Sequence, residues 1–402
     1  MKSAHLHIRI SAHLTPAHQK HMNWKFWKKD KSKPKKKKSA LREWGDAIIF
    51  AVIAATLIRT LFIEAYVIPS GSMESSLLIG DYLFVSKVNY GARMPITPVA
   101  IPFMHHTIPY TTNTKAYWDG IQLPYYRLPG FSDIKKGDIV VFNAPIEADS
   151  PYYRPVDKRE NIIKRCQGTP GDTLSLVNAQ VYINGKPETT PFKGEMAYVV
   201  KTDGSQINPQ LINELHLSDI GIIDSTTFKT NTTVASAKTL KGYSNIKSVT
   251  ADIAPKGIAD DLNPVYPAKY PRYKNTPTFP HYTWNVDNYG PIIIPKKGWT
   301  VKLDSLTLPV YGRAIEVYEH NKVKVVGRDI YINDKKADTY TFKLNYYWMM
   351  GDNRHNSEDS RYWGFLPEDH VVGKALFTWL SVDSTASFVN KIRWSRLFRG
   401  IH

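Results

Sequence analysis

Four serines lie within seven positions in YVIPSGSMESSLLIGD, residues 66–81, directly after a long apolar run. A serine hydroxyl is a weak nucleophile until a neighbouring base removes its proton. Histidine is the usual base, but none of the eight histidines after residue 63 lies in a stretch that resembles an element of a catalytic triad. The other competent base is a lysine whose amine is neutral. The chemistry of these serines therefore depends on a lysine elsewhere in the chain.

Lys164 is the lysine whose surroundings best suit that role. Lowering the pKa of a lysine from about 10.4 to near 7 takes roughly 4 kcal/mol of burial and local charge effects, so a catalytic lysine belongs in an apolar strand. In NIIKRC, strand alternation places Ile162, Lys164 and Cys166 on one face. Ile163 and Arg165 then lie on the other face. The alternatives are a lysine that reaches solvent from an edge strand and serines that only stabilise a turn.

Four blocks of sequence occur in a fixed order: IPSGSM, KGDIVVF, IIKRCQGTPGD and GDNRHNSEDSRYWGF. Together they resemble the bacterial type I signal peptidases, the Ser/Lys endopeptidases that cut signal peptides from exported proteins. The match is specific because four separate blocks agree. It covers about a quarter of the chain, at about residues 64–90, 134–145, 162–174 and 346–382.

The resemblance assigns roles position by position. It implies that Ser72 is the nucleophile and Lys164 the general base. Ser70 matches the hydroxyl of the family's oxyanion hole, which acts with the backbone N–H of Ser72, and Ser357 matches the residue that hydrogen-bonds to the lysine and orients it. The family's apolar cleft accepts small side chains in an Ala-x-Ala pattern. Its candidate lining residues in this chain are Tyr66, Ile68, Leu77 and Ile163.

Other positions match supporting residues or depart from the family pattern. Asp359 matches an acid that pairs with Arg165 and Arg361, so these three residues are expected to hold the site together. Ser75 and Ser76 have no assigned role and look like turn residues. The departures from the family's usual residues affect loop packing and fine specificity more than the reaction, and they fall at Ser75, Ser76, Gln167, Thr169 and His355.

The elements that must position these residues are predicted to form a mainly β protein. Pro69 and Gly71 end the preceding apolar segment in a tight bend. The segments AQVYINGKPE and GRDIYINDKKAD end in Asn-Gly and Asn-Asp, which predicts two hairpins. We expect an antiparallel β catalytic domain over residues 64–178 and 339–402. An inserted second β-rich domain with hairpins is expected over residues 179–338.

The segment Trp44–Ile63 is predicted to be a transmembrane helix, because 20 residues span about 30 Å. Its alternatives are a buried helix and the core of a cleaved signal peptide. Residues 1–43 are predicted to be a basic cytoplasmic arm: between Lys20 and Arg42, 11 Lys or Arg and one acid carry +10 of the net charge of +17. This location favours contact with anionic lipid over nucleic acid. The positive-inside rule places everything after Ile63 outside the cytoplasmic (inner) membrane of a bacterium.

Several other readings of the sequence are weaker. DNRHNSED fails the calcium-loop template, the S-x-x-K matches SDIK and SNIK lack the accompanying K-T-G, and Cys166 lacks the local signatures of a cysteine protease. We therefore expect neither a cofactor nor a metal ion. The wider alternatives are a Ser/Lys self-cleaving regulator and a catalytically silent membrane-anchored binding protein. The expected partners are signal peptides of exported preproteins and the lipid bilayer, and the resemblance leaves room for a contact with the secretion machinery.

Overall fold

The computed structural model describes residues 39–111, 114–188, 194–269, 282–384, 386–387 and 390–401. Most of the predicted basic arm lies outside these residues. The chain divides into two compact units, Met1–Ala51 and Val52–His402. The predictions for the catalytic site all fall within the second unit.

The apolar segment forms helix α1, Ala40–Leu61, which begins four residues earlier than the predicted Trp44 and ends before Ile63. The earlier start follows from the local sequence, because Ala40 and Leu41 are strong helix formers and the Ser39 carbonyl accepts a hydrogen bond from the Glu43 N–H. By length and composition, α1 could cross a membrane. The chain becomes extended at once after the helix.

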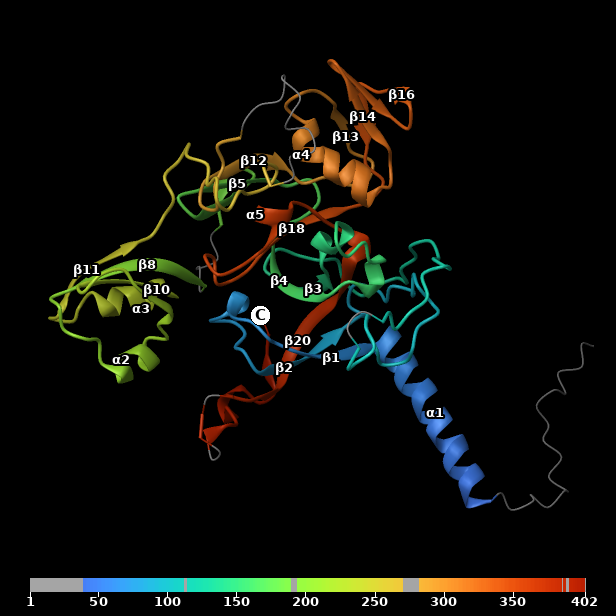
Figure 1. Ribbon diagram of the computed structural model, residues 1–402, viewed down its shortest axis with the longest axis horizontal. Helices are drawn as coiled ribbons and strands as arrows, with labels where there is room; N and C mark the ends of the chain where they lie inside the picture. Colours follow the sequence, from blue (N-terminus) through green and yellow to red (C-terminus); the bar gives the residue numbers. More distant parts are fainter. Residues whose placement is uncertain are drawn as a thin grey trace, which may run out of the picture. The chain divides into compact units, whose positions relative to one another are not determined.

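The largest sheet has eight strands, all paired antiparallel, and it carries the segments of the four sequence blocks (Figure 1). Strand β3 is buried along its whole length, because KGDIVVF provides a continuous apolar run after a turn. Its strands, in spatial order, are β1 (Ile63–Val67), β2 (Asp81–Ser86), β20 (Val371–Ser381), β3 (Ile139–Asn143), β4 (Asn161–Gly168), β18 (Tyr346–Met350) and β19 (Leu366–Pro367), with β21 (Arg399–Gly400) paired to β20. The predicted mainly β, antiparallel fold class is therefore correct.

Three smaller sheets pack around one aromatic-rich core, which includes Trp348, Phe342 and Phe365. The two predicted hairpins occur here, and both have turn residues with positive φ, Asn184-Gly185 and Asn333-Asp334. The strands are β12 (Tyr289–Ile293), β5 (Thr173–Val177), β6 (Gln180–Ile183) and β7 (Lys186–Pro187); β13 (Thr300–Lys302) and β17 (Thr339–Thr341); and β14 (Val323–Val326), β15 (Asp329–Ile332) and β16 (Lys335–Lys336). Helix α4, Leu308–Arg313, is buried against the same core.

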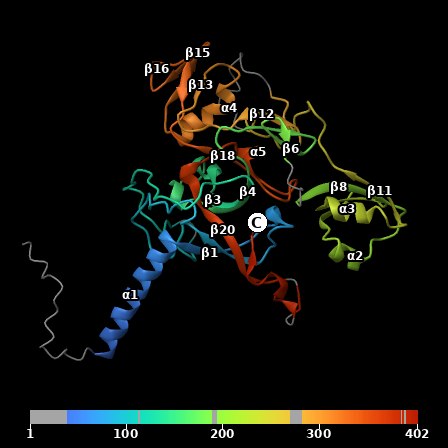
Figure 2. The same cartoon turned by 180° about the vertical axis from the view of Figure 1, so that it is seen from behind.

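A separate four-stranded sheet has its own small core, built from residues such as Val200, Phe228 and Leu240. Its strand order is β11 (Ile246–Ala251), β8 (Glu195–Thr202), β10 (Thr227–Thr233) and β9 (Ser218–Ile222). Helices α2 (Pro209–Glu214) and α3 (Val234–Leu240) accompany it, as Figure 1 and the reverse view in Figure 2 show. The predicted insert thus contains strands from more than one core, and the predicted domain boundaries at 178 and 338 stay a prediction.

Candidate active site

Ser72 lies in a single turn of 3₁₀ helix, Gly71–Met73, that follows β1. Ser70 precedes this turn in an extended conformation. Met73 and Leu77 are fully buried and anchor the turn in the core beneath the sheet. A Cβ atom at Gly71 would lie 2.5 Å from a carboxylate oxygen of Glu74, so a larger residue there would displace the Glu74 side chain. The buried Met73 and Leu77 side chains thus fix the position of the turn that carries Ser72.

Lys164 lies in β4, between β3 and β18, with its side chain beside Ser72. The Lys164 Nζ atom is 2.6 Å from the Ser72 Oγ atom, although the two residues are 92 positions apart. Lys164 is only 5% exposed. Burial lowers the pKa of its amine, and this effect outweighs the opposing influence of the Asp359, Asp352 and Glu358 carboxylates. A neutral Lys164 amine could accept the Ser72 hydroxyl proton directly.

Ser357 does not make the hydrogen bond to Lys164 that the resemblance implies. Its hydroxyl is buried and has no hydrogen-bond partner among the described residues, because the Lys164 amine is directed at Ser72 instead. Ser357 packs against Gly351, where a Cβ atom would lie 2.2 Å from the Ser357 Oγ and 2.5 Å from the Ser72 carbonyl oxygen. Gly351 therefore lets the loop that carries Ser357 approach Ser72.

Asp359 forms a fully buried ion pair with Arg361, in which the Arg361 Nη2 and Nε atoms lie 2.8 and 2.9 Å from its oxygens. Asp359 also accepts a hydrogen bond from the Gly351 N–H. Burial alone would raise the pKa of the Asp359 carboxyl, but the Arg361 charge and the hydrogen bonds it accepts outweigh that effect and lower the pKa. Asp359 is thus a buried anion whose partner is the expected Arg361.

Arg165 pairs with Asp352 rather than with the expected Asp359. The Arg165 Nη2 atom lies 2.7 Å from Asp352, and a second nitrogen lies 2.9 Å from the same carboxylate. Alternation explains the change, since Arg165 points to the opposite face of β4 from Lys164. The sequence suggested that Ser76 was only a turn residue. Its hydroxyl donates a hydrogen bond to Asp352 and accepts one from Arg165. Ser76 therefore links the segment that follows Ser72 to the loop at Asp352.

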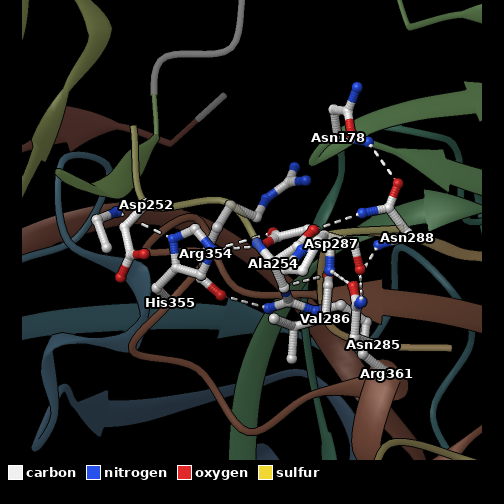
Figure 3. A network of polar contacts seen from close by, with 12 residues as sticks. Asn178, Asp252, Ala254, Asn285, Val286, Asp287, Asn288, Arg354, His355 and Arg361 are labelled. Atoms are coloured by element: carbon white, nitrogen blue, oxygen red, sulfur yellow. Dashed lines mark hydrogen bonds and ion pairs between the residues drawn. The ribbon is translucent and has the colours of Figure 1, made fainter. Parts of the chain in front are cut away.

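His355 lies in the same loop, and its recorded hydrogen bonds go to neither Ser72 nor Lys164. Its Nδ1 atom accepts a hydrogen bond from the Ala197 N–H of β8. Its Nε2 atom lies 3.0 Å from Asp287 (Figure 3). Asp287 also accepts from the Ala254 N–H. Figure 3 shows that Arg361 reaches the same network through the Val286 carbonyl. His355 therefore joins the catalytic loop to two segments that sequence reasoning left without a role.

A cavity of about 300 Å³ opens beside Ser72 and Lys164. Its polar lining includes Ser70, Asn356 and Glu358. Its apolar lining comprises Ala144, Pro145, Ile146, Ile162 and Trp363. The sequence signal for this apolar wall was the NAP that ends the KGDIVVFNAP stretch and the tryptophan of SRYWGF.

The four residues expected to line the substrate cleft do not line this cavity. Ile68 and Leu77 are buried in the core, and Ile163 packs against them. The Tyr66 hydroxyl donates a hydrogen bond to the Glu64 carboxylate. Ile162 lines the cavity in place of Ile163 because it shares the strand face of Lys164. The alternation in β4 decides which isoleucine lines the cavity beside Ser72.

A family model described as signal peptidase, peptidase S26, matches residues 41–247 and 298–380, well over half of the chain. Signal peptidase I of Buchnera aphidicola subsp. Baizongia pistaciae is 26% identical over 335 residues, which are 82% of this chain and 73% of the relative. Signal peptidase I of Rickettsia massiliae is 24% identical over 389 residues, 93% of this chain and 97% of the relative. A crystal structure of signal peptidase I from Enterococcus faecalis is 14% identical, covers 60% of this chain and 96% of that structure, and has a TM-score of 0.19.

The protein is therefore a serine endopeptidase, a hydrolase of peptide bonds. Within that class, the chain belongs to the S26 signal peptidase family, whose members remove signal peptides from preproteins. Burial raises the pKa of the Cys166 thiol and keeps it protonated, which fits a serine rather than a cysteine nucleophile.

Proposed function

We propose that Ser72 is the nucleophile and Lys164 the general base of this peptidase. The observation that carries the proposal is the 2.6 Å separation of the Lys164 Nζ and Ser72 Oγ atoms, combined with the burial of the lysine. General-base catalysis needs this reach and a base whose pKa lies near the working pH. The Lys164 amine already faces the Ser72 hydroxyl, so proton transfer between them needs no rearrangement of side chains.

The reaction then follows the usual course of acyl transfer. As Ser72 Oγ attacks the carbonyl carbon, its proton passes to Lys164, and the carbonyl electron pair moves onto oxygen. Lys164 gives that proton to the leaving amine when the C–N bond breaks, which leaves an acyl-enzyme on Ser72. Water then gives a proton to Lys164 as it attacks the ester carbonyl. When the bond between the Ser72 Oγ atom and the carbonyl carbon breaks, Lys164 returns that proton to Ser72 Oγ, and the peptide leaves with its new C-terminal carboxyl group.

The oxyanion is proposed to be held by the backbone N–H of Ser72 and the hydroxyl of Ser70. Ser70 is extended, lines the cavity and makes no capping bond to the turn that follows it, so its side chain can turn towards a bound substrate. Each such donor is worth about 10²- to 10³-fold in rate in measured oxyanion holes. Ser70→Ala would therefore lower turnover without disturbing the fold.

We propose that the cavity selects small side chains, in an Ala-x-Ala-like pattern before the cut. Ala144, Pro145 and Ile162 provide a mostly apolar wall of limited volume beside Ser72. A pocket of this kind favours small apolar groups over large or charged ones, because a buried charge would be left without a partner.

Membrane anchoring is proposed to keep this site at the membrane surface. Helix α1 could span the bilayer, with the basic arm in the cytoplasm in contact with anionic lipid and the catalytic sheet on the outer face. Ser72 follows Leu61 by eleven residues, which limits their separation to about 40 Å. Signal peptides end near the same surface, and a contact with the secretion machinery there would be consistent with this arrangement.

The test is cleavage of a preprotein by the purified protein in detergent. Ser72→Ala and Lys164→Ala should each abolish product formation. Ser205→Ala and Lys186→Ala are matched controls, because both residues are exposed and lie outside the cavity. Near-normal turnover of Lys164→Ala at pH 7 to 8 would show that the Ser72/Lys164 assignment is wrong.

A further inference from the structure

Strand β9 forms one end of the four-stranded sheet, and it exposes an apolar edge. It pairs with β10 alone among the described residues. Four of its five residues are exposed. Ile222 is 84% exposed, and Ile220 and the following Ile223 are 42% and 59% exposed. An exposed apolar edge strand is a template for another strand, and proteins usually cover or charge such edges.

The first residues of β9 are tied to the active-site cavity. The Asp219 carboxylate accepts a hydrogen bond of 2.6 Å from Asn356, a residue that lines the cavity. Asp219 also accepts from Asn231, which in turn donates to the Asn353 side chain. The Asn353 N–H donates to the carbonyl of Ser72 itself. The edge of β9 thus begins beside the nucleophile turn.

Backbone contacts fix the position of this sheet on the catalytic loop. The Glu195 N–H donates to the Asp352 carbonyl, and the Arg354 N–H donates to the Glu195 carbonyl, both at 2.8 Å. The Ser218 hydroxyl then joins β9 to the Glu195 carboxylate. Because main-chain hydrogen bonds hold β8 against residues 352–354, the edge of β9 has a defined place relative to the cavity.

Three carboxylates, those of Glu74, Glu195 and Asp219, lie where the cavity meets β9. They indicate whether the edge of β9 binds the substrate upstream or downstream of the cleaved bond. Burial, followed by the Glu74 and Asp219 charges, raises the pKa of Glu195 to about 7. Burial and the Asp219 charge likewise raise the pKa of Glu74. The three groups are therefore close enough to repel one another. Glu195 is buried, whereas Glu74 and Asp219 are accessible to solvent. Cleavage leaves an ammonium group at the new N-terminus of the released chain, and the accessible Glu74 and Asp219 carboxylates are complementary to that charge.

We propose that the outer edge of β9 binds the extended segment of the preprotein directly downstream of the cut, by adding it as a further strand to the sheet. Asp219 has a positive φ and the pairing with β10 shifts register there, so the regular part of β9 is the three residues that follow, about 10 Å long. This length is enough to pair with the first residues of the mature chain. Ile220 and Ile222 lie on one face by strand alternation and would contact alternate side chains of the bound segment. The inference rests on the proposed Ser72/Lys164 function and adds a second substrate contact.

Two synthetic peptides with the same Ala-x-Ala cleavage sequence test the proposal on the full-length protein. The short peptide ends about two residues after the cut, and the long one continues for about eight residues of Thr- and Val-rich sequence. For the wild-type protein, kcat/KM should be higher for the long peptide by about 10-fold, roughly 1.4 kcal/mol. Ile222→Lys, and separately Ile220→Lys, should bring the ratio of long to short towards 1 through a higher KM for the long peptide.

Val326→Lys is the matched control, because Val326 is an exposed apolar residue on the edge strand β14 of a different sheet. Its ratio should equal that of the wild type. In Ser72→Ala protein, a photoreactive residue placed four positions after the cut should cross-link to β9. A ratio that neither isoleucine variant changes, a cross-link elsewhere, or a β9 edge that pairs two copies of the chain in solution would overturn the inference. Failure of the wild type to cleave even the short peptide would instead overturn the proposed function.

Discussion

The Lys164 amine lies in contact with the Ser72 hydroxyl, and opposing electrostatic effects act on this buried amine. Burial lowers the pKa of Lys164, whereas Asp359, Asp352 and Glu358 act to raise it. Burial is the largest of these effects, so the folded protein favours the neutral amine more than water does. The acid side of the pH–rate profile should therefore report on Lys164.

A substitution at Glu358 should shift the pKa of Lys164 without disturbing the core. Its side chain is 54% exposed and it lines the cavity. Glu358→Gln removes a charge that raises the pKa of Lys164, so the acid limb of kcat/KM should move to lower pH. Measuring kcat/KM from pH 5 to 9 checks this. The control is Glu214→Gln, at an exposed position in α2, and a shift to higher pH in Glu358→Gln would contradict the electrostatic account.

Removal of the buried Lys164 amine is predicted to make the folded protein more stable. Between the lowered pKa of folded Lys164 and the ordinary value of 10.5, the unfolded chain binds the proton more readily, so the stability of the wild type rises with pH in this window. Lys164→Met removes this cost while filling a similar volume. Its midpoint of urea unfolding should exceed that of the wild type at pH 6, and the difference should shrink towards pH 10. An equal difference at both pH values would contradict the assignment of the cost to the buried amine.

At the scale of elements, the site depends on β4 and the loop after β18 more than on the serine stretch alone. Strand alternation in β4 sends Lys164 to Ser72 and Arg165 to Asp352 on the other face. The loop then supplies Asp359 to Arg361 beneath the site. The Arg165–Asp352 pair, with the Ser76 hydroxyl, holds β4, the segment after Ser72 and the loop together, whereas the Asp359–Arg361 pair braces the loop itself.

His355 provides a prediction at this scale. His355→Ala leaves the Ala197 N–H and the Asp287 carboxylate short of a partner, so unfolding free energy should fall by about 1–3 kcal/mol. Turnover should fall less than about 10-fold, whereas loss of the general base in Lys164→Ala should cost at least about 10²-fold. Denaturant unfolding and single-turnover cleavage check both values. His355→Asn, which keeps an acceptor near the Nδ1 position, should recover part of the stability, and a loss of activity as large as that of Lys164→Ala would show that His355 takes part in the reaction.

At the scale of the whole molecule, most of the net positive charge is in the arm before α1 rather than in the enzyme that follows. A cluster of lysines beside a membrane span gains about 1 kcal/mol for each lysine near an anionic surface. The remainder of the chain carries about +5. We therefore propose that this charge acts on membrane contact rather than on the reaction.

Replacement of Lys35, Lys36, Lys37 and Lys38 by glutamine tests this distribution of charge. Binding to vesicles that contain anionic lipid should weaken by about 1 kcal/mol for each lysine at low salt, and the effect should fade at high salt. Flotation with anionic and neutral vesicles measures it. A variant with four exposed lysines replaced after α1, at Lys238, Lys241, Lys247 and Lys256, is the control. Equal weakening on neutral vesicles would contradict a role in contacting anionic lipid.

The sequence by itself determined the features that depend on local pattern. Composition and turn residues predicted a mainly β fold with hairpins at Asn184-Gly185 and Asn333-Asp334, because backbone conformations with positive φ require such residues. An apolar run of membrane length predicted α1. The family blocks and the need for a neutral base selected Ser72 and Lys164 as candidates, although the sequence contains no information on their distance.

Only the tertiary structure decided which partners meet across long separations in the chain. It paired Arg165 with Asp352, left the Ser357 hydroxyl without a hydrogen-bond partner in the described part of the chain, and used Ile162 in place of Ile163 in the cavity wall. It also joined His355 to Ala197 and Asp287. Such contacts depend on the register and packing of strands far apart in sequence, and no local pattern specifies them. The place of β9 beside the cavity is a consequence of the same long-range packing.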